Sequence, residues 1–351
     1  MAKPGLNLRT CRGCLSTSAS AKGWVLCIGA GASDPIFPRW NALVVKLLQW
    51  SNKRLTSNEI SLLLNSLSLE SIIESVFHRK RIGATRFAQL LTDLLYSDLK
   101  AKVSAHEWKL IEILLGDVGL PRINNSRAAN LLYLVATHYP NSTPLQLAEV
   151  LGQSIVVDRG PLAILSFNAE NLLLALAQAY IWTNTMLPKR RYFDPSLRGM
   201  SHRNFNRIPY HFCHGLLPFP GRGPRNYATS LDKLVFSESN YLNIASSSFT
   251  WQSAVFLNAA ISHNVVFVGL SFTDQNLRRW LGFVQANRME ELRRTGTPVH
   301  ASTQHYWINK RPSTLRQEKL IEASTAHLGV RLVWIDDWSQ IRKALEHMLL
   351  L

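Results

Sequence analysis

The sequence predicts an α/β fold with a parallel sheet, helices on both faces of the sheet and a helical insertion after the first strand. Three observations support this prediction. Short apolar runs without polar alternation recur along the chain, as is typical of strands buried on both faces. Most of these runs precede a segment with helical spacing, which indicates repeated strand–turn–helix units. A long Leu-rich segment with helical spacing separates the first run from the second.

Five apolar runs are the expected strands, and three of the segments that follow them are the expected helices. The strands are Trp24–Ile28, Leu162–Phe167, Val265–Val268, His305–Ile308 and Arg331–Ile335. The helices are Asn168–Ala179, Asp274–Gln285 and Trp338–Leu350. We expect residues 1–22 to be an N-terminal extension and residues 23–351 to form one domain.

Two segments interrupt this alternation. Residues from about 41 to 155 carry Leu at helical spacing and are divided by breakers such as Pro121 and Pro140, so we interpret them as the helical insertion. Residues from about 188 to 226 are rich in Arg and end in a cluster of Pro and Gly, so we interpret them as a long basic loop. The loop could contact nucleic acid, although a run of charge is usually a solvated face.

Composition limits the class of protein. Apolar residues make up 46% of the chain, which excludes a disordered protein. The 39 basic and 23 acidic residues give a net charge of +16, which favours phosphates, polyanions or an acidic partner. Four cysteines and the lack of a signal-peptide-like apolar run at the start predict a reducing, cytoplasmic location. The uncharged stretch Tyr241–Thr273 holds many polar residues, so it predicts a buried helix and strand rather than a membrane span.

The first expected strand runs directly into a glycine turn. Gly29, Ala30, Gly31 and Ser33 follow Ile28. Glycines at a strand-to-helix turn let backbone amides approach a pyrophosphate, although the same pattern also suits a tight turn without a ligand.

Two further strands also end in polar turns. Ser166 and Asn168 lie where the second strand ends, and the Asn168 amide suits either a ribose hydroxyl and a water or the N-cap of a helix. Gly269, Ser271 and Asp274 follow a later strand, where they could bind a nucleotide or cap the next helix.

A histidine pair gives the last motif. On an extended segment, His211 and Cys213 share one face and His214 points to the other, which opposes one metal bound by all three. His214 precedes Gly215 and a Pro-rich stretch, and this position suits a general base at a cleft or a structural histidine.

The four motifs in this order resemble the sirtuin-like superfamily, which has a Rossmann-like domain. The resemblance rests on a GAG-x-S turn, an Asn turn with Glu170 in place of the usual Asp, an HG strand end and a G-x-S-x-x-D-x-N turn. The segment Phe236–Tyr241 is similar to a further acidic motif of that superfamily. This resemblance implies that residues 23–351 bind NAD⁺.

The chain also departs from the deacetylases of this superfamily. Pro38-Arg39-Trp40 resembles the bacterial anti-phage defence branch, and the loop before it lacks a usual Gly. No cysteine follows Cys213, so the usual four-Cys zinc module cannot form and no zinc is expected. We interpret the only CxxC, Cys11 to Cys14, as a surface thiol pair.

The resemblance therefore implies an NAD⁺ glycohydrolase that cleaves the nicotinamide–ribose bond and depletes NAD⁺ in anti-phage defence. It assigns catalysis to Asn168 and His214. The expected nucleotide contacts are Gly29, Ala30, Gly31, Ser33, Ser166, Gly269, Ser271 and Asp274, with Ser271 and Asp274 on the adenosine half. We expect gating by homo-oligomerisation or by a partner, such as a HerA-type ATPase or a short Argonaute, with no membrane association. The alternatives are a nucleic-acid module, a zinc-free protein deacylase and a non-catalytic NAD or ADP-ribose sensor.

Overall fold

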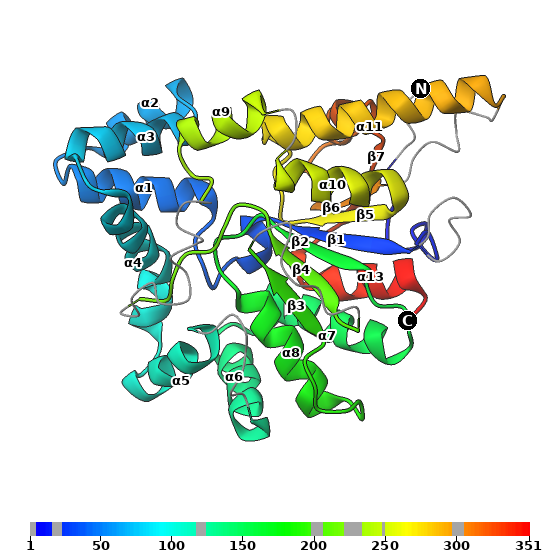
Figure 1. The fold of residues 1–351 in the computed structure, drawn as a ribbon, viewed down its shortest axis with the longest axis horizontal. Coiled ribbons are helices and arrows are strands. Elements are labelled where there is room, and N and C mark those ends of the chain that lie inside the picture. The colour runs from blue at the N-terminus through cyan, green and yellow to red at the C-terminus, as the bar shows by residue number, and fades with distance from the viewer. Residues whose placement is uncertain are drawn as a thin grey trace.

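A computed structural model describes residues 5–15, 23–116, 124–197, 206–220, 234–247, 250–296 and 305–351. These residues form a seven-stranded, all-parallel sheet in the order β3-β4-β2-β1-β5-β6-β7 (Figure 1). The strands are β1 Trp24–Ile28, β2 Ala163–Ser166, β3 Phe193–Ser196, β4 Ile208–Phe212, β5 Asn264–Val268, β6 His305–Lys310 and β7 Val330–Ile335. The fold is α/β and Rossmann-like, as predicted.

All five expected strands are present, and two more lie where a loop was expected. The strands β3 and β4 fall within residues 188–226, so the interpretation of that whole range as a loop is wrong. Both strands contain a proline, and proline in a run argues against a strand in sequence-based reasoning. Residues 198–205 and 221–226 of the expected loop lie outside the described residues.

Thirteen helices surround the sheet in the described part of the chain. They are α1 Trp40–Ser51, α2 Ser57–Ser66, α3 Leu69–Lys80, α4 Ala84–Lys102, α5 Ala105–Leu115, α6 Asn125–His138, α7 Thr143–Val156, α8 Leu172–Asn184, α9 Glu238–Ser246, α10 Trp251–Ser262, α11 Gln275–Arg294, α12 Leu315–Ala326 and α13 Ile341–Leu349. Helices α1 to α7 all lie between β1 and β2 in the chain, where the insertion was expected. Figure 1 shows α1 to α5 gathered beside the sheet.

The central strands β1 and β5 are buried at every position, which explains their largely apolar runs. Leu26 and Val266 pack on one face in a core shared with α7, α8 and α13. Val25 and Phe267 pack on the opposite face in a core shared with α10 and α11. Successive side chains of a strand point to opposite faces, so a strand between two helical layers favours apolar residues at most positions. The sheet therefore lies between two helical layers.

The structure tests the sequence predictions for the CxxC pair near the N-terminus and for the uncharged stretch Tyr241–Thr273. Leu6 forms a parallel bridge with Val333 of β7, and Cys11 is fully buried. Cys11 and Cys14 are therefore not the surface pair that was expected. The uncharged stretch contains α10 and β5, as predicted. Within the described residues, no single helix is long and apolar enough to cross a membrane, and only the sharply bent pair α2–α3 reaches that length and composition jointly.

Candidate functional site

The predicted site residues lie in turns at the carboxyl edge of the four adjacent strands β4, β2, β1 and β5. In a parallel sheet these turns are neighbours, and this edge is where α/β proteins bind ligands. The register pairs Ser166 of β2 with Phe212 of β4, so Asn168 and His214 each lie two residues beyond a paired position. Both predicted catalytic residues therefore leave the sheet at the same place.

Asn168 belongs to a buried cluster with Ser33 and Glu170, which we call the amide cluster. The Asn168 Nδ2 donates to Ser33 Oγ at 2.9 Å and to Glu170 Oε1 at 3.0 Å. The Ser33 hydroxyl donates to Glu170 Oε1 at 2.5 Å. All three residues are at most 4% exposed. The glycine turn after β1 and the Asn turn after β2 are thus joined by side-chain hydrogen bonds.

The amide cluster leaves one strong acceptor without a partner. Its two hydrogen bonds occupy the Nδ2 of Asn168 and fix the amide plane, whereas Asn168 Oδ1 is buried and has no hydrogen-bond partner. This oxygen is therefore free to accept a hydrogen bond from a hydroxyl or a water. The alternative role of Asn168 as a helix N-cap is wrong, because Asn171 holds that position in α8.

Glu170 is a member of the site that sequence reasoning noted only as a departure from Asp. Its Oε2 accepts from the backbone N–H of Leu172 at 2.5 Å, so the side chain also secures the start of α8. Burial raises the pKa of Glu170, while the hydrogen bonds from Ser33, Leu172 and Asn168 act in the opposite direction. One carboxyl group therefore contacts both Ser33 and Asn168 of the amide cluster and the start of α8.

The glycines of the first turn allow a close approach between two turns. The Gly31 N–H donates to the Gly269 carbonyl at 2.9 Å, and Gly29 N–H donates to the Val268 carbonyl at 3.0 Å. A Cβ on Gly269 would lie 2.0 Å from the Ala32 nitrogen, and the φ of Gly269 is +70°. Glycine is therefore required at position 269 by both space and backbone conformation. The proposed contact of these residues with a pyrophosphate stays a prediction.

His214 lies in an aromatic and acidic environment. Its ring packs edge-on against Phe167 at 4.8 Å and Tyr241 at 5.4 Å between ring centroids. Its Nε2 is 3.7 Å from Asp274 Oδ2. Burial lowers the pKa of His214, and the charge of Asp274 partly opposes this shift. His214 is therefore a neutral imidazole at neutral pH, as a general base must be.

Asp274 is placed by α11 beside the imidazole. Its Oδ1 accepts from the backbone N–H groups of Asn276 and Leu277, so it caps α11, as the alternative reading of this turn predicted. The same bonds leave Oδ2 facing His214. The expected adenosine contact of Asp274 stays a prediction, and the position of its carboxylate beside the His214 ring is a feature that the spacing of the motifs did not indicate.

The remaining predicted site residues have different surroundings. Ser166 is fully buried, and its Oγ accepts from the Asn168 N–H at 3.2 Å, which helps to shape the Asn turn. Ser271 is exposed and its Oγ lies 2.7 Å from Thr273 Oγ1. Ala30 lies in the short helix that follows Gly29 and is half-buried. Nucleotide contacts of these residues also stay predictions.

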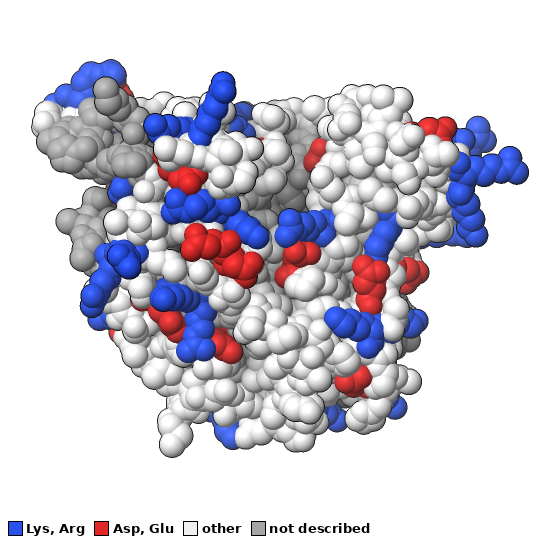
Figure 2. Space-filling model, turned by 180° about the vertical axis from the view of Figure 1, so that it is seen from behind, with Lys and Arg blue, Asp and Glu red and all other residues white. Residues whose placement is uncertain are grey.

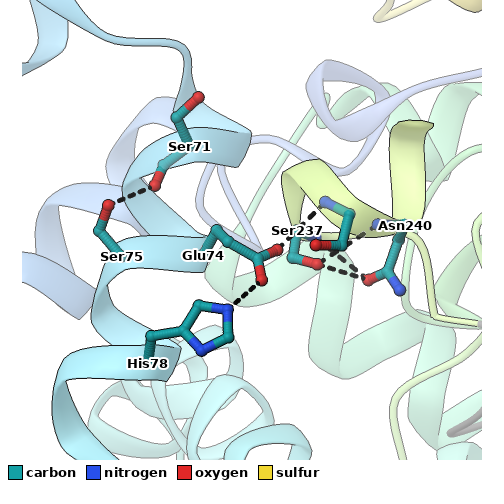
Figure 3. A network of polar contacts seen from close by, with 7 residues as sticks. Ser71, Glu74, Ser75, His78, Ser237 and Asn240 are labelled. Carbon is teal, nitrogen blue, oxygen red and sulfur yellow. Dashed lines mark hydrogen bonds and ion pairs between the residues drawn. The ribbon is translucent and has the colours of Figure 1, made fainter. Parts of the chain in front are cut away.

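Helix α9 carries Tyr241 over His214 and is fastened to the insertion. Figure 3 shows Glu74 of α3 reaching the first turn of α9. The Ser239 N–H donates to Glu74 Oε2 at 3.1 Å, and Glu74 Oε1 is 2.7 Å from His78 Nε2. Burial opposes ionisation of Glu74, but hydrogen bonds from Ser237, Ser239 and His78 lower its pKa overall. The insertion thus contributes to holding the aromatic wall of the site.

Two further properties bear on the ligands of the chain, namely its capacity to hold a metal ion and the distribution of its surface charge. In the described residues, no group of three or more His, Cys, Asp or Glu side chains is placed to hold a metal ion. Figure 2 shows basic and acidic side chains interspersed over much of one face, with basic groups concentrated at two opposite edges.

A comparison with known protein families finds one similarity. The SIR2-like domain family matches residues 174–328, which include His214, Ser271 and Asp274 but not the glycine turn or Asn168. No curated protein matches the chain. SIR2-like domains use NAD⁺, so the match supports the sirtuin-like resemblance over residues 174–328.

Proposed function

We propose, with this SIR2-like match as the premise, that the chain is an NAD⁺ glycohydrolase that cleaves the bond between nicotinamide and ribose. The unpaired, buried Oδ1 of Asn168 is the observation that carries the proposal. Its amide is already fixed by Ser33 and Glu170, so the oxygen is preorganised to accept from a ribose hydroxyl or from the attacking water.

The reaction needs little from the protein beyond orientation and one proton acceptor. The carbon–nitrogen bond breaks with its electron pair going to nicotinamide, which leaves as a neutral molecule, while positive charge develops on the ribose. A water oxygen then bonds to the ribose carbon and loses a proton. His214 is the proton acceptor in this proposal, because burial keeps its imidazole neutral.

We further propose that activity is gated by oligomerisation or by a partner, as the anti-phage effector role would require. Asn168 and Ser33 are at most 4% exposed, and the His214 side chain is 14% exposed. Such burial supports a gated site. Helix α9 carries Tyr241 against the His214 ring, so we propose that α9 moves to admit the substrate. The defence role itself rests on the resemblance of Pro38-Arg39-Trp40 to that branch.

The experiment is a chromatographic assay of nicotinamide and ADP-ribose after incubation of the chain with NAD⁺, alone and with the product of a neighbouring gene. Asn168→Ala and His214→Ala should each abolish release of both products. Exposed Asn58 and His106 provide matched controls, and Asn58→Ala and His106→Ala should release both products like the unmodified chain. Full activity in either site variant would contradict the assignment.

Two other outcomes would replace the proposal. Release of nicotinamide only in the presence of an acylated peptide would assign a deacylase. Binding of NAD⁺ without any turnover, under every condition tested, would assign a sensor.

A further inference from the structure

A group of exposed cations, which we call the basic edge, lies where α1 passes to α2 and α3 passes to α4. It consists of Lys53, Arg54, Arg79, Lys80, Arg81 and Arg86. The two turns are neighbours, because α1 packs against α3 and α4, and Lys80 Nζ lies 5.6 Å from the ring centroid of Trp50. Figure 2 shows basic side chains projecting at the edge of the molecule that α2 and α3 occupy in Figure 1.

Within the described residues, these cations have no acidic partners. None of the six forms an ion pair with a carboxylate in the part of the chain that the structure describes. In contrast, the exposed Arg293 and Arg294 at the end of α11 both pair with Glu290. Clustered cations without counter-charges repel each other, and an anionic ligand would relieve that repulsion.

Helix stabilisation explains only part of the basic edge. Arg79, Lys80 and Arg81 lie at the carboxyl end of α3, where the helix dipole favours cations. Arg86 lies in the first turn of α4, where the dipole disfavours a cation, and no acidic residue accompanies it there. Lys53 and Arg54 lie in a turn outside any helix. Half of the group therefore has no role in stabilising the fold that we can identify.

We propose that the basic edge binds single-stranded nucleic acid. The six cations would contact successive phosphates, and a base would stack on Trp50, which is 42% exposed at the end of α1. An exposed aromatic ring among cations is the combination that single-strand binders use, whereas an anionic membrane or an acidic protein would need no stacking surface. This inference is independent of the proposed NAD⁺ chemistry.

The test is fluorescence anisotropy of a labelled oligo(dT) strand with the full chain, compared with a duplex and with phosphatidylserine vesicles. If all six cations contact phosphates, log K should fall against log salt with a slope of about −4, or about 300-fold between 50 and 200 mM salt. Failure to bind the strand at the lowest salt, or tighter binding of the duplex or the vesicles, would overturn the proposal.

Variants locate the surface. The charge-removing variant carries Lys53→Gln, Arg54→Gln, Arg79→Gln and Lys80→Gln. The control, which removes the same net charge elsewhere on the surface, carries Arg293→Gln, Arg294→Gln, Arg316→Gln and Lys319→Gln. We expect the first variant to lower the slope to about −1 and the control to leave it near −4. Equal weakening by both would overturn the proposal.

A single substitution tests stacking separately from charge. Trp50→Leu should weaken binding of the strand about tenfold without changing the salt slope. Unchanged affinity would contradict the role of Trp50. Circular dichroism would verify that each variant is folded, as expected for substitutions at exposed positions.

Discussion

Ser33→Ala is the sharpest test of the amide cluster. The substitution removes a hydroxyl that donates to Glu170 Oε1 and accepts from Asn168 Nδ2, and it changes little else in volume. Each of these two hydrogen bonds contributes about 1 kcal/mol, so the free energy of unfolding should fall by about 2 kcal/mol. With an unfolding entropy of about 2.1 cal/mol/K per residue over 351 residues, this corresponds to a Tm about 3 °C lower.

The measurement is urea denaturation with a thermal melt, and Ser154→Ala is the matched control. Ser154 is also fully buried, but its hydroxyl donates only to the Leu151 carbonyl within α7. The control should therefore lose about 1 kcal/mol or less. A Ser33→Ala protein as stable as the Ser154→Ala protein would refute the hydrogen-bonded cluster.

Three further predictions concern the surroundings of the site and the opposite end of the sheet. Asp274→Asn keeps a helix cap but removes the negative charge that opposes the lowering of the His214 pKa. The acid limb of the pH–rate profile should therefore move to lower pH, and a move to higher pH would contradict an electrostatic effect of Asp274 on His214. Glu74→Gln weakens the hydrogen bond that holds the first turn of α9, so hydrogen exchange of the α9 amides should become about tenfold faster. Ser75→Ala, also in α3, should leave these exchange rates unchanged. Equal exchange rates in the two variants would show that Glu74 does not hold α9. Burial lowers the pKa of His305 from 6.5 to about 3, so between these pH values only the unfolded state binds the proton, and the free energy of unfolding falls as pH decreases. Between pH 6.5 and 5.0, His305→Asn should lose about 1.5 kcal/mol less of its free energy of unfolding than the unmodified chain, as measured by denaturation. An identical loss in both proteins would count against a neutral, buried His305.

The sequence predicted the sheet because burial on both faces leaves a direct record in the strands. Continuous apolar runs such as Trp24–Ile28 identify central parallel strands without ambiguity. The strands β3 and β4 were missed because both contain proline and polar residues. The other edge strand, β7, was predicted because its sequence is largely apolar. Local pattern therefore identifies the apolar strands of this sheet, whether they are central or at an edge.

The sequence predicted which residues lie at the site, but it predicted only some of the contacts between them. The positions of Asn168 and His214 follow from motifs at strand ends, because parallel strands bring their carboxyl ends together. The contacts of Glu170 with Ser33, and of Glu74 with α9, join residues more than 130 positions apart. Such pairings depend on how the turns and the insertion pack, which no local spacing encodes.

The most direct measurement is a crystal structure of the chain with a non-hydrolysable NAD⁺ analogue in which a carbon replaces the ribose ring oxygen. The proposed function predicts that a ribose hydroxyl or an ordered water lies within hydrogen-bond distance of Asn168 Oδ1, with His214 beside the same ribose and α9 displaced. An analogue bound elsewhere, with Asn168 Oδ1 still buried and unpaired, would contradict the account.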